Sequence, residues 1–152
     1  MAQDGSIDLR DWNFSSKGPV KLNGTWNFYW QHFIRPENIA ESNVPSGILI
    51  QVPGDWNDTI VNGKTLNGHG FATYHLRLHF QKPDKNLALR ILDASTAVTV
   101  YANGKQVFTA GSPGTSPTKS KPRFEPQIVE LPFIGAQLDL VFHVSNFHHR
   151  LG

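Results

Sequence analysis

The chain has 152 residues, of which 39% are hydrophobic and 17% charged, so it can form one packed core and is not a disordered chain. It has no cysteine, which excludes a disulfide framework, a thiolate nucleophile and a cysteine zinc site. The formal net charge is only +2 and no basic block accompanies it, so nucleic acid is not expected as a partner. We expect a single domain over residues 1–152, with residues 1–6 as a flexible N-terminus.

Short runs that alternate between apolar and polar residues predict β-strands along most of the chain. In chain order they span residues 26–30, 48–52, 74–80, 87–91, 98–102, 105–108, 127–131 and 138–145. In the clearest run Tyr74, Leu76, Leu78 and Phe80 share one face, and the three residues between them, His75, Arg77 and His79, share the other. Only residues 31–40 have room for a short helix, whose length Pro36 limits.

Turn signals separate these runs. Asn-Gly occurs four times, at residues 23–24, 62–63, 67–68 and 103–104, and each pair is a candidate turn because a type I′ hairpin needs positive φ at both central residues. Residues 111–126 contain four prolines and no periodicity, which predicts a long surface loop that is functional or mobile. Many short strands and frequent turns favour an antiparallel sandwich or barrel.

Residues with catalytic or metal-binding chemistry form no convincing constellation. On a strand, His75 and His79 lie about 13 Å apart, too far to share one ion, and we expect both to face solvent. Asp55, Asp58 and Asp93 lie near turns, where they suit either Asx-type turns or a structural Ca²⁺. We expect no other cofactor and, because no nucleophile motif or pair of acids is present, no enzymatic activity.

The aromatic residues suggest a ligand site instead. Trp12, Trp26, Trp30 and Trp56 offer flat surfaces, and Trp56, in a turn-rich segment, is the one expected at a loop rim. With it we predict a rim site of donors and acceptors suited to a polyhydroxylated ligand, made of Asn57, His69, Arg123, Asn146, His148 and His149. The alternative is a polar stripe on a sheet face, formed by His75, Arg77 and His79.

Five segments occur in an order that resembles a known family: residues 22–30 (LNGTWNFYW), 52–56 (VPGDW), 70–76 (GFATYHL), 100–105 (VYANGK) and 144–150 (VSNFHHR). Over residues 9–150 the chain resembles the extracellular sensory domain of bacterial receptors that have seven transmembrane helices and diverse intracellular signalling modules. It is similar, more distantly, to the galactose-binding-like jelly roll that precedes the catalytic barrel of family 2 glycoside hydrolases.

The resemblance implies an all-β, galactose-binding-domain-like jelly-roll sandwich in the periplasm or outside the cell. It implies a sensor for a carbohydrate or another polar small molecule, excised from a membrane receptor whose remaining chain is its partner, and it leaves an oligomer open. Two other interpretations stay open. One is a non-catalytic, sugar-binding accessory domain of a glycoside hydrolase, and the other is a purely structural interaction domain.

Overall fold

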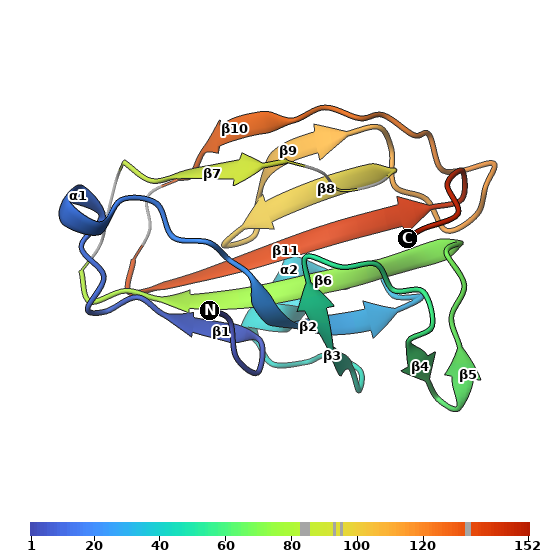
Figure 1. Cartoon of the computed structure of the whole chain (residues 1–152), viewed down its shortest axis with the longest axis horizontal. Coiled ribbons are helices and arrows are strands. Elements are labelled where there is room, and N and C mark those ends of the chain that lie inside the picture. The colour runs from blue at the N-terminus through green and yellow to red at the C-terminus, as the bar shows by residue number, and fades with distance from the viewer. Residues whose placement is uncertain (83–85, 93, 95, 133–134) are drawn as a thin grey trace.

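The computed structural model of the chain describes residues 1–82, 86–92, 94, 96–132 and 135–152, and it is dominated by β-strands (Figure 1). The strands are β1 (Ser6–Asp8), β2 (Gly24–Trp30), β3 (Ile48–Val52), β4 (Ile60–Val61), β5 (Lys64–Thr65), β6 (Gly70–His79), β7 (Ala88–Ile91), β8 (Ala97–Ala102), β9 (Lys105–Ala110), β10 (Gln127–Glu130) and β11 (Gln137–Asn146). The helices α1 (Phe14–Lys17) and α2 (Pro36–Ala40) have only 4 and 5 residues. Every predicted strand is confirmed, whereas α1 and the short strands β1, β4 and β5 were not predicted.

One large sheet organises the molecule. Its strands follow the order β3-β2-β6-β11-β8-β9, and the long antiparallel pair β6–β11 lies at its centre. β2 pairs with the first half of β6, while β1 runs parallel to the second half of the same edge. A separate two-stranded sheet, β7–β10, lies apart from this sheet, and β4–β5 form a small hairpin near the C-terminus (Figure 1). Figure 1 places α1 at the left end of the molecule and the C-terminus at the right end.

The alternation in β6 and β11 builds the core. Leu76 and Leu78 of β6 pack with Leu138 and Leu140 of β11 in one buried cluster, which also contains residues of β2, β7 and β8. These side chains come from one face of the large sheet, and Leu89 and Ile91 on β7 cover them from the second layer. The all-β jelly-roll sandwich predicted from the sequence is therefore confirmed.

The opposite face of the large sheet is partly covered as well. The segment that contains α2 lies over it, and a second buried cluster forms there from Tyr29, Ile34, Ile39 and Val141. His143 on β11 stacks against Phe33 at 5.0 Å, and its Nε2 lies 2.7 Å from the carbonyl oxygen of Ile34. Burial lowers the pKa of His143 below its ordinary value, despite the opposing effect of this hydrogen bond. The residues between the core positions of β6 and β11 therefore do not simply face water.

The first residues of the chain are part of the fold, so the expectation of a flexible N-terminus over residues 1–6 was wrong. Ala2 is only 2% exposed, and its N–H donates to the carbonyl oxygen of Asn23 at 2.7 Å. Ser6 begins β1, whose backbone pairs with β6. The reason is that β2 leaves half of the β6 edge unpaired, and the N-terminal strand satisfies those backbone groups.

Two of the four Asn-Gly pairs are hairpin turns. Asn103 and Gly104 have φ values of 45° and 83° between β8 and β9, and residues 62–63 form the same kind of turn between β4 and β5. The other two pairs are not hairpins, since Gly24 begins β2 and Gly68 precedes β6.

Replacing Gly104 by valine is expected to lower the free energy of unfolding by about 1–3 kcal/mol, because a β-branched residue is strained at positive φ. No atom lies within 4 Å of the added Cβ, so the loss is due to backbone strain and not to a clash. Chemical denaturation measures the change. Gly135→Val is the control, since its backbone is not left-handed and open space surrounds its Cβ position. Equal stability of the two variants would contradict the strain.

Candidate ligand-binding site

Two of the predicted rim residues, Asn57 and Asn146, lie together where β11 ends, but their side chains hold the C-terminal residues of the chain. The side-chain nitrogen of Asn146 lies 2.8 Å from the carbonyl oxygens of Gly68 and His149 and 2.6 Å from that of Leu151. Asn57 donates to the carbonyl oxygen of Arg150 and accepts from the N–H of Gly152, both at 3.0 Å. These amides fasten residues 149–152 to the end of the sandwich, so they are not free to bind a ligand.

The prediction that Trp56 is an exposed stacking surface was wrong. Its side chain is 0% exposed, and its ring lies 5.3 Å from Trp30, 6.2 Å from Phe28 and 6.5 Å from Tyr74. Its indole N–H donates to the carbonyl oxygen of Asn67 at 2.9 Å. The turn residues around Trp56 correctly indicated a loop, but the large apolar area of an indole favours burial when the loop lies against a core.

The other rim candidates are exposed, and each has contacts of its own. Arg123 forms an ion pair with Glu125 at 3.0 Å, and the imidazole of His148 lies 3.3 Å from the carbonyl oxygen of Ser120. The imidazole of His149 contacts Leu151. The backbone N–H of His69 donates to the side-chain oxygen of Asn67 at 2.9 Å. The long loop that carries Arg123 is tied down at Ser120, whose hydroxyl lies 2.8 Å from that of Ser145.

Because residues 149–152 lie against the backbone at Gly68, we expect a substitution of Gly68 to lower the stability of the fold. A Cβ added there would clash with the backbone of Arg150, whereas a Cβ on Gly135 meets no atom within 4 Å. Gly68→Ala is expected to lower the free energy of unfolding by about 1–3 kcal/mol, and Gly135→Ala to change it little. Thermal unfolding compares the two variants. An unchanged melting temperature for Gly68→Ala would show that the C-terminal segment is not fastened at this point.

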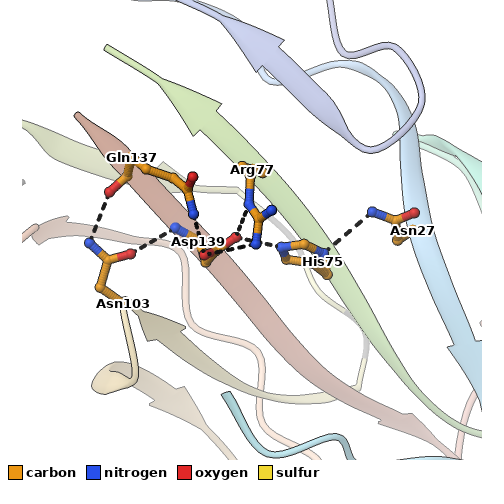
Figure 2. A network of polar contacts seen from close by, with 6 residues as sticks. All are labelled: Asn27, His75, Arg77, Asn103, Gln137 and Asp139. Atoms are coloured by element: carbon orange, nitrogen blue, oxygen red, sulfur yellow. Dashed lines mark hydrogen bonds and ion pairs between the residues drawn. The ribbon is translucent and has the colours of Figure 1, made fainter. Parts of the chain in front are cut away.

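The alternative site on the sheet face is a closed network, shown in Figure 2. His75 is 6% exposed, and its Nε2 lies 2.7 Å from Oδ1 of Asp139. Arg77 donates to the same carboxylate through Nε at 2.8 Å, and the amide of Asn27 lies 3.3 Å from Nδ1 of His75. The interpretation of His75 as a solvent-facing member of a polar stripe was therefore wrong, since the strands on either side of β6 supply partners that enclose it.

The carboxylate of Asp139, at the centre of this network, is held in its ionised form. Burial alone would raise the pKa of Asp139, but hydrogen bonds from His75 and Arg77 and the positive charge of Arg77 outweigh burial and hold this pKa well below its usual range. Gln137 donates to the second carboxylate oxygen at 3.1 Å, and Asn103 accepts from the backbone N–H of Asp139 at 2.8 Å. Asp139 thus remains an ionised, fully bonded carboxylate, suited to holding strands together.

A hollow lies at the opposite end of the molecule, beside α1. It has a volume of about 430 Å³ and is lined by Leu9, Arg10, Asp11, Trp12, Asn13, Phe14, Ser15, Phe80, Gln81 and Lys82. Sequence reasoning did not assign these residues to a site, because two segments far apart in sequence form it. They meet where the N–H of Leu9 donates to the carbonyl oxygen of His79 at 2.8 Å. The only sequence signal was the exposed context of Trp12, between Asp11 and Asn13.

The residues that the structure describes contain no group of three His, Asp or Glu side chains placed to hold a metal ion. Asp55 accepts the backbone N–H of Asn57 at 3.2 Å, as in an Asx-type turn. Asp93, the third carboxylate considered for calcium, lies outside the described residues. Across the described ranges, no helix has the length and apolar character needed to cross a membrane.

Comparisons with known proteins find likeness at the level of structure. No family model and no curated protein matches the sequence. A β-glucuronidase from Ruminococcus gnavus, in complex with N1-substituted uronic isofagomine, matches with a TM-score of 0.55 at 20% identity, over 84% of this chain and 22% of the enzyme. The structure with D-glucaro-δ-lactam gives a TM-score of 0.57 over 86% and 22%. The chain thus spans about a fifth of these enzymes, and at this identity the likeness shows a shared β-sandwich fold.

Proposed function

We propose that the chain is a non-catalytic, carbohydrate-binding module that accompanies a glycoside hydrolase. One observation carries the proposal. The structural match with a β-glucuronidase covers 84% of this chain and only 22% of the enzyme, so the shared β-sandwich is one part of a larger glycoside hydrolase. The similarity to the jelly roll of family 2 glycoside hydrolases, noted in the sequence, agrees with this interpretation. The structural matches described above are enzymes, and none is a membrane receptor, so the sensory interpretation, its receptor partner and its periplasmic location stay predictions.

The environment of Asp139 agrees with the non-catalytic part of the proposal. His75, Arg77 and Gln137 all form hydrogen bonds with this carboxylate. A general acid must hold a proton near neutral pH, which requires a raised pKa, whereas the pKa of Asp139 is lowered. The network therefore supports a structural role for Asp139 and argues against this residue as a general acid.

A paired measurement tests the proposal on the purified 152-residue chain. Binding to a glycan array and hydrolysis of nitrophenyl glycosides are measured on the same preparation. The expected result is binding to at least one class of glycan and no hydrolysis. Failure to bind any glycan would refute the carbohydrate-binding role. Hydrolysis that survives repurification and disappears on replacing a single Asp or Glu would refute the non-catalytic role.

A further inference from the structure

The hollow beside α1 is lined by the aromatic residues Trp12, Phe14 and Phe80. The helix α1 itself lies at the left end of Figure 1. Of its apolar lining residues, Leu9 and Phe80 are buried, 4% and 7% exposed, whereas Trp12 and Phe14 are only half-buried. The indole N–H of Trp12 donates to the carbonyl oxygen of Gly18 at 3.1 Å, which fixes the orientation of the ring. A partly exposed, fixed indole is a suitable surface for the C–H face of a sugar ring, because little side-chain entropy is lost on stacking.

The walls of the hollow supply groups that hydroxyls can bond. Asp11, Gln81 and Lys82 line it. Within the described part of the chain, the side chains of Gln81 and Lys82 form no hydrogen bond, and Asp11 interacts with the neighbouring charge of Arg10. Together they offer an acceptor, an amide and a donor, the set that vicinal hydroxyls use. Asn13 contributes less, because its side-chain oxygen already accepts the N–H of Ser16 at 3.1 Å.

The charges that line the hollow nearly cancel. The guanidinium of Arg10 is engaged with the carboxylate of Asp8 through both oxygens, and the hydrogen bonds from Arg10 lower the pKa of Asp8, so this pair stays ionised and neutral overall. That leaves Asp11 and Lys82, one charge of each sign. Lys17 is not part of the lining, but its ammonium lies over one face of the Trp12 ring, 5.2 Å from the centroid, and 3.3 Å from the carbonyl oxygen of Asp11. The lining itself thus carries no net charge, which suits a neutral polar ligand, and the one further charge, on Lys17, is already engaged by the Trp12 ring and the carbonyl oxygen of Asp11.

We propose that the hollow binds a neutral hexopyranose ring, stacked on Trp12, whose hydroxyls bond to Asp11, Gln81 and Lys82. The volume of about 430 Å³ lies within the range of small-molecule sites. This inference rests on the proposed carbohydrate-binding function and adds the location of the site and the class of sugar. It places the site at the opposite end of the sandwich from the rim predicted from the sequence.

The indole N–H signals of the four tryptophans in a nitrogen–proton NMR spectrum test the proposal. Trp12→Phe identifies the Trp12 signal, and the probes are methyl β-glucopyranoside, methyl β-galactopyranoside, cellobiose and lactose, with sodium glucuronate as the charged comparison. A neutral probe should shift the Trp12 signal while those of Trp26 and Trp56, 5% and 0% exposed, stay in place. Glucuronate should bind no better than the methyl glycosides.

Two surface variants complete the test without touching the core. Lys82→Gln and Gln81→Ala should each weaken binding of the neutral probe about three- to tenfold, the effect of one lost hydrogen bond. Lys64→Gln, an exposed lysine in β5 near the C-terminus, is the matched control and should leave binding unchanged. Sugar binding that leaves the Trp12 signal unmoved, or that requires a carboxylate, would overturn this site while the proposed function stands. Absence of binding by every probe and by the glycan array would overturn both.

Discussion

Replacing Trp56 by alanine is expected to lower the free energy of unfolding by about 3–5 kcal/mol, the cost of removing a large aromatic side chain from a core. The ring is 0% exposed and contacts three other aromatic rings, so the substitution leaves a large cavity and also removes the hydrogen bond to Asn67. Because the free energy of unfolding of a domain is only about 5–15 kcal/mol, this loss removes a large fraction of the stability. Denaturant unfolding followed by tryptophan fluorescence or circular dichroism measures the effect.

This outcome is the opposite of what the rim interpretation of Trp56 requires, namely lost ligand affinity with an unchanged melting temperature. Trp12→Phe is the comparison, because Trp12 is half-buried and phenylalanine retains most of its apolar contact. That variant should unfold within about 1.5 kcal/mol of the wild type. A Trp56→Ala variant as stable as Trp12→Phe would show that the Trp56 ring lies outside the core.

Replacing Asp139 by asparagine is expected to destabilise the fold by about 2–3 kcal/mol. The substitution leaves the buried His75 and the guanidinium of Arg77 without their anionic partner, and breaking a buried ion pair from one side is costly. The value is set below the usual range for buried pairs because the Arg77 side chain is 30% exposed and water solvates part of its charge. Asp8→Asn is the matched control, since it removes the partner of Arg10 from an exposed pair and should hardly move the unfolding midpoint.

The effect of Asp139→Asn should depend on pH in a defined direction. The folded pKa of Asp139 is held below its ordinary value of 3.8, so its ionised form stabilises the fold fully above pH 3.8. As the pH falls below 3.8 toward the lowered folded pKa, the unfolded chain takes up the proton first and the stabilisation is lost. The difference in unfolding free energy between wild type and variant should therefore shrink in acid. A difference that is constant from pH 7 to pH 2 would contradict the assigned network.

Some parts of the candidate sites could be predicted from the sequence and others could not, because side-chain direction is a local property whereas strand pairing is not. The alternation in β6 and β11 predicted which side chains enter the core, because side-chain direction in a strand follows position alone. It also placed His75 and Arg77 on one face together. It did not show that Asp139 on β11 lies opposite Arg77, since strand pairing and register join residues far apart in the chain.

The hollow beside α1 illustrates the same limit. Its two segments are brought together by the pairing of β1 with β6, and a three-residue strand is too short for its alternation to stand out. The rim interpretation of Trp56 failed for a related reason. Turn residues reveal that the chain bends, but the direction in which a side chain then points depends on the layers that surround the bend.

By itself, the sequence determined the fold class, the positions of the long strands and the hairpin turn at Asn103-Gly104, because hydrophobic alternation and positive φ are local properties of the chain. Only the tertiary structure decided which polar residues are enclosed and which face a hollow. It turned Trp56 into core and Asn146 into a fastening for the C-terminal residues, and it left Trp12 beside an open hollow. Burial depends on how the layers pack together. Two residues of the same type in similar local sequence can therefore differ, one buried in the core and the other exposed at the surface.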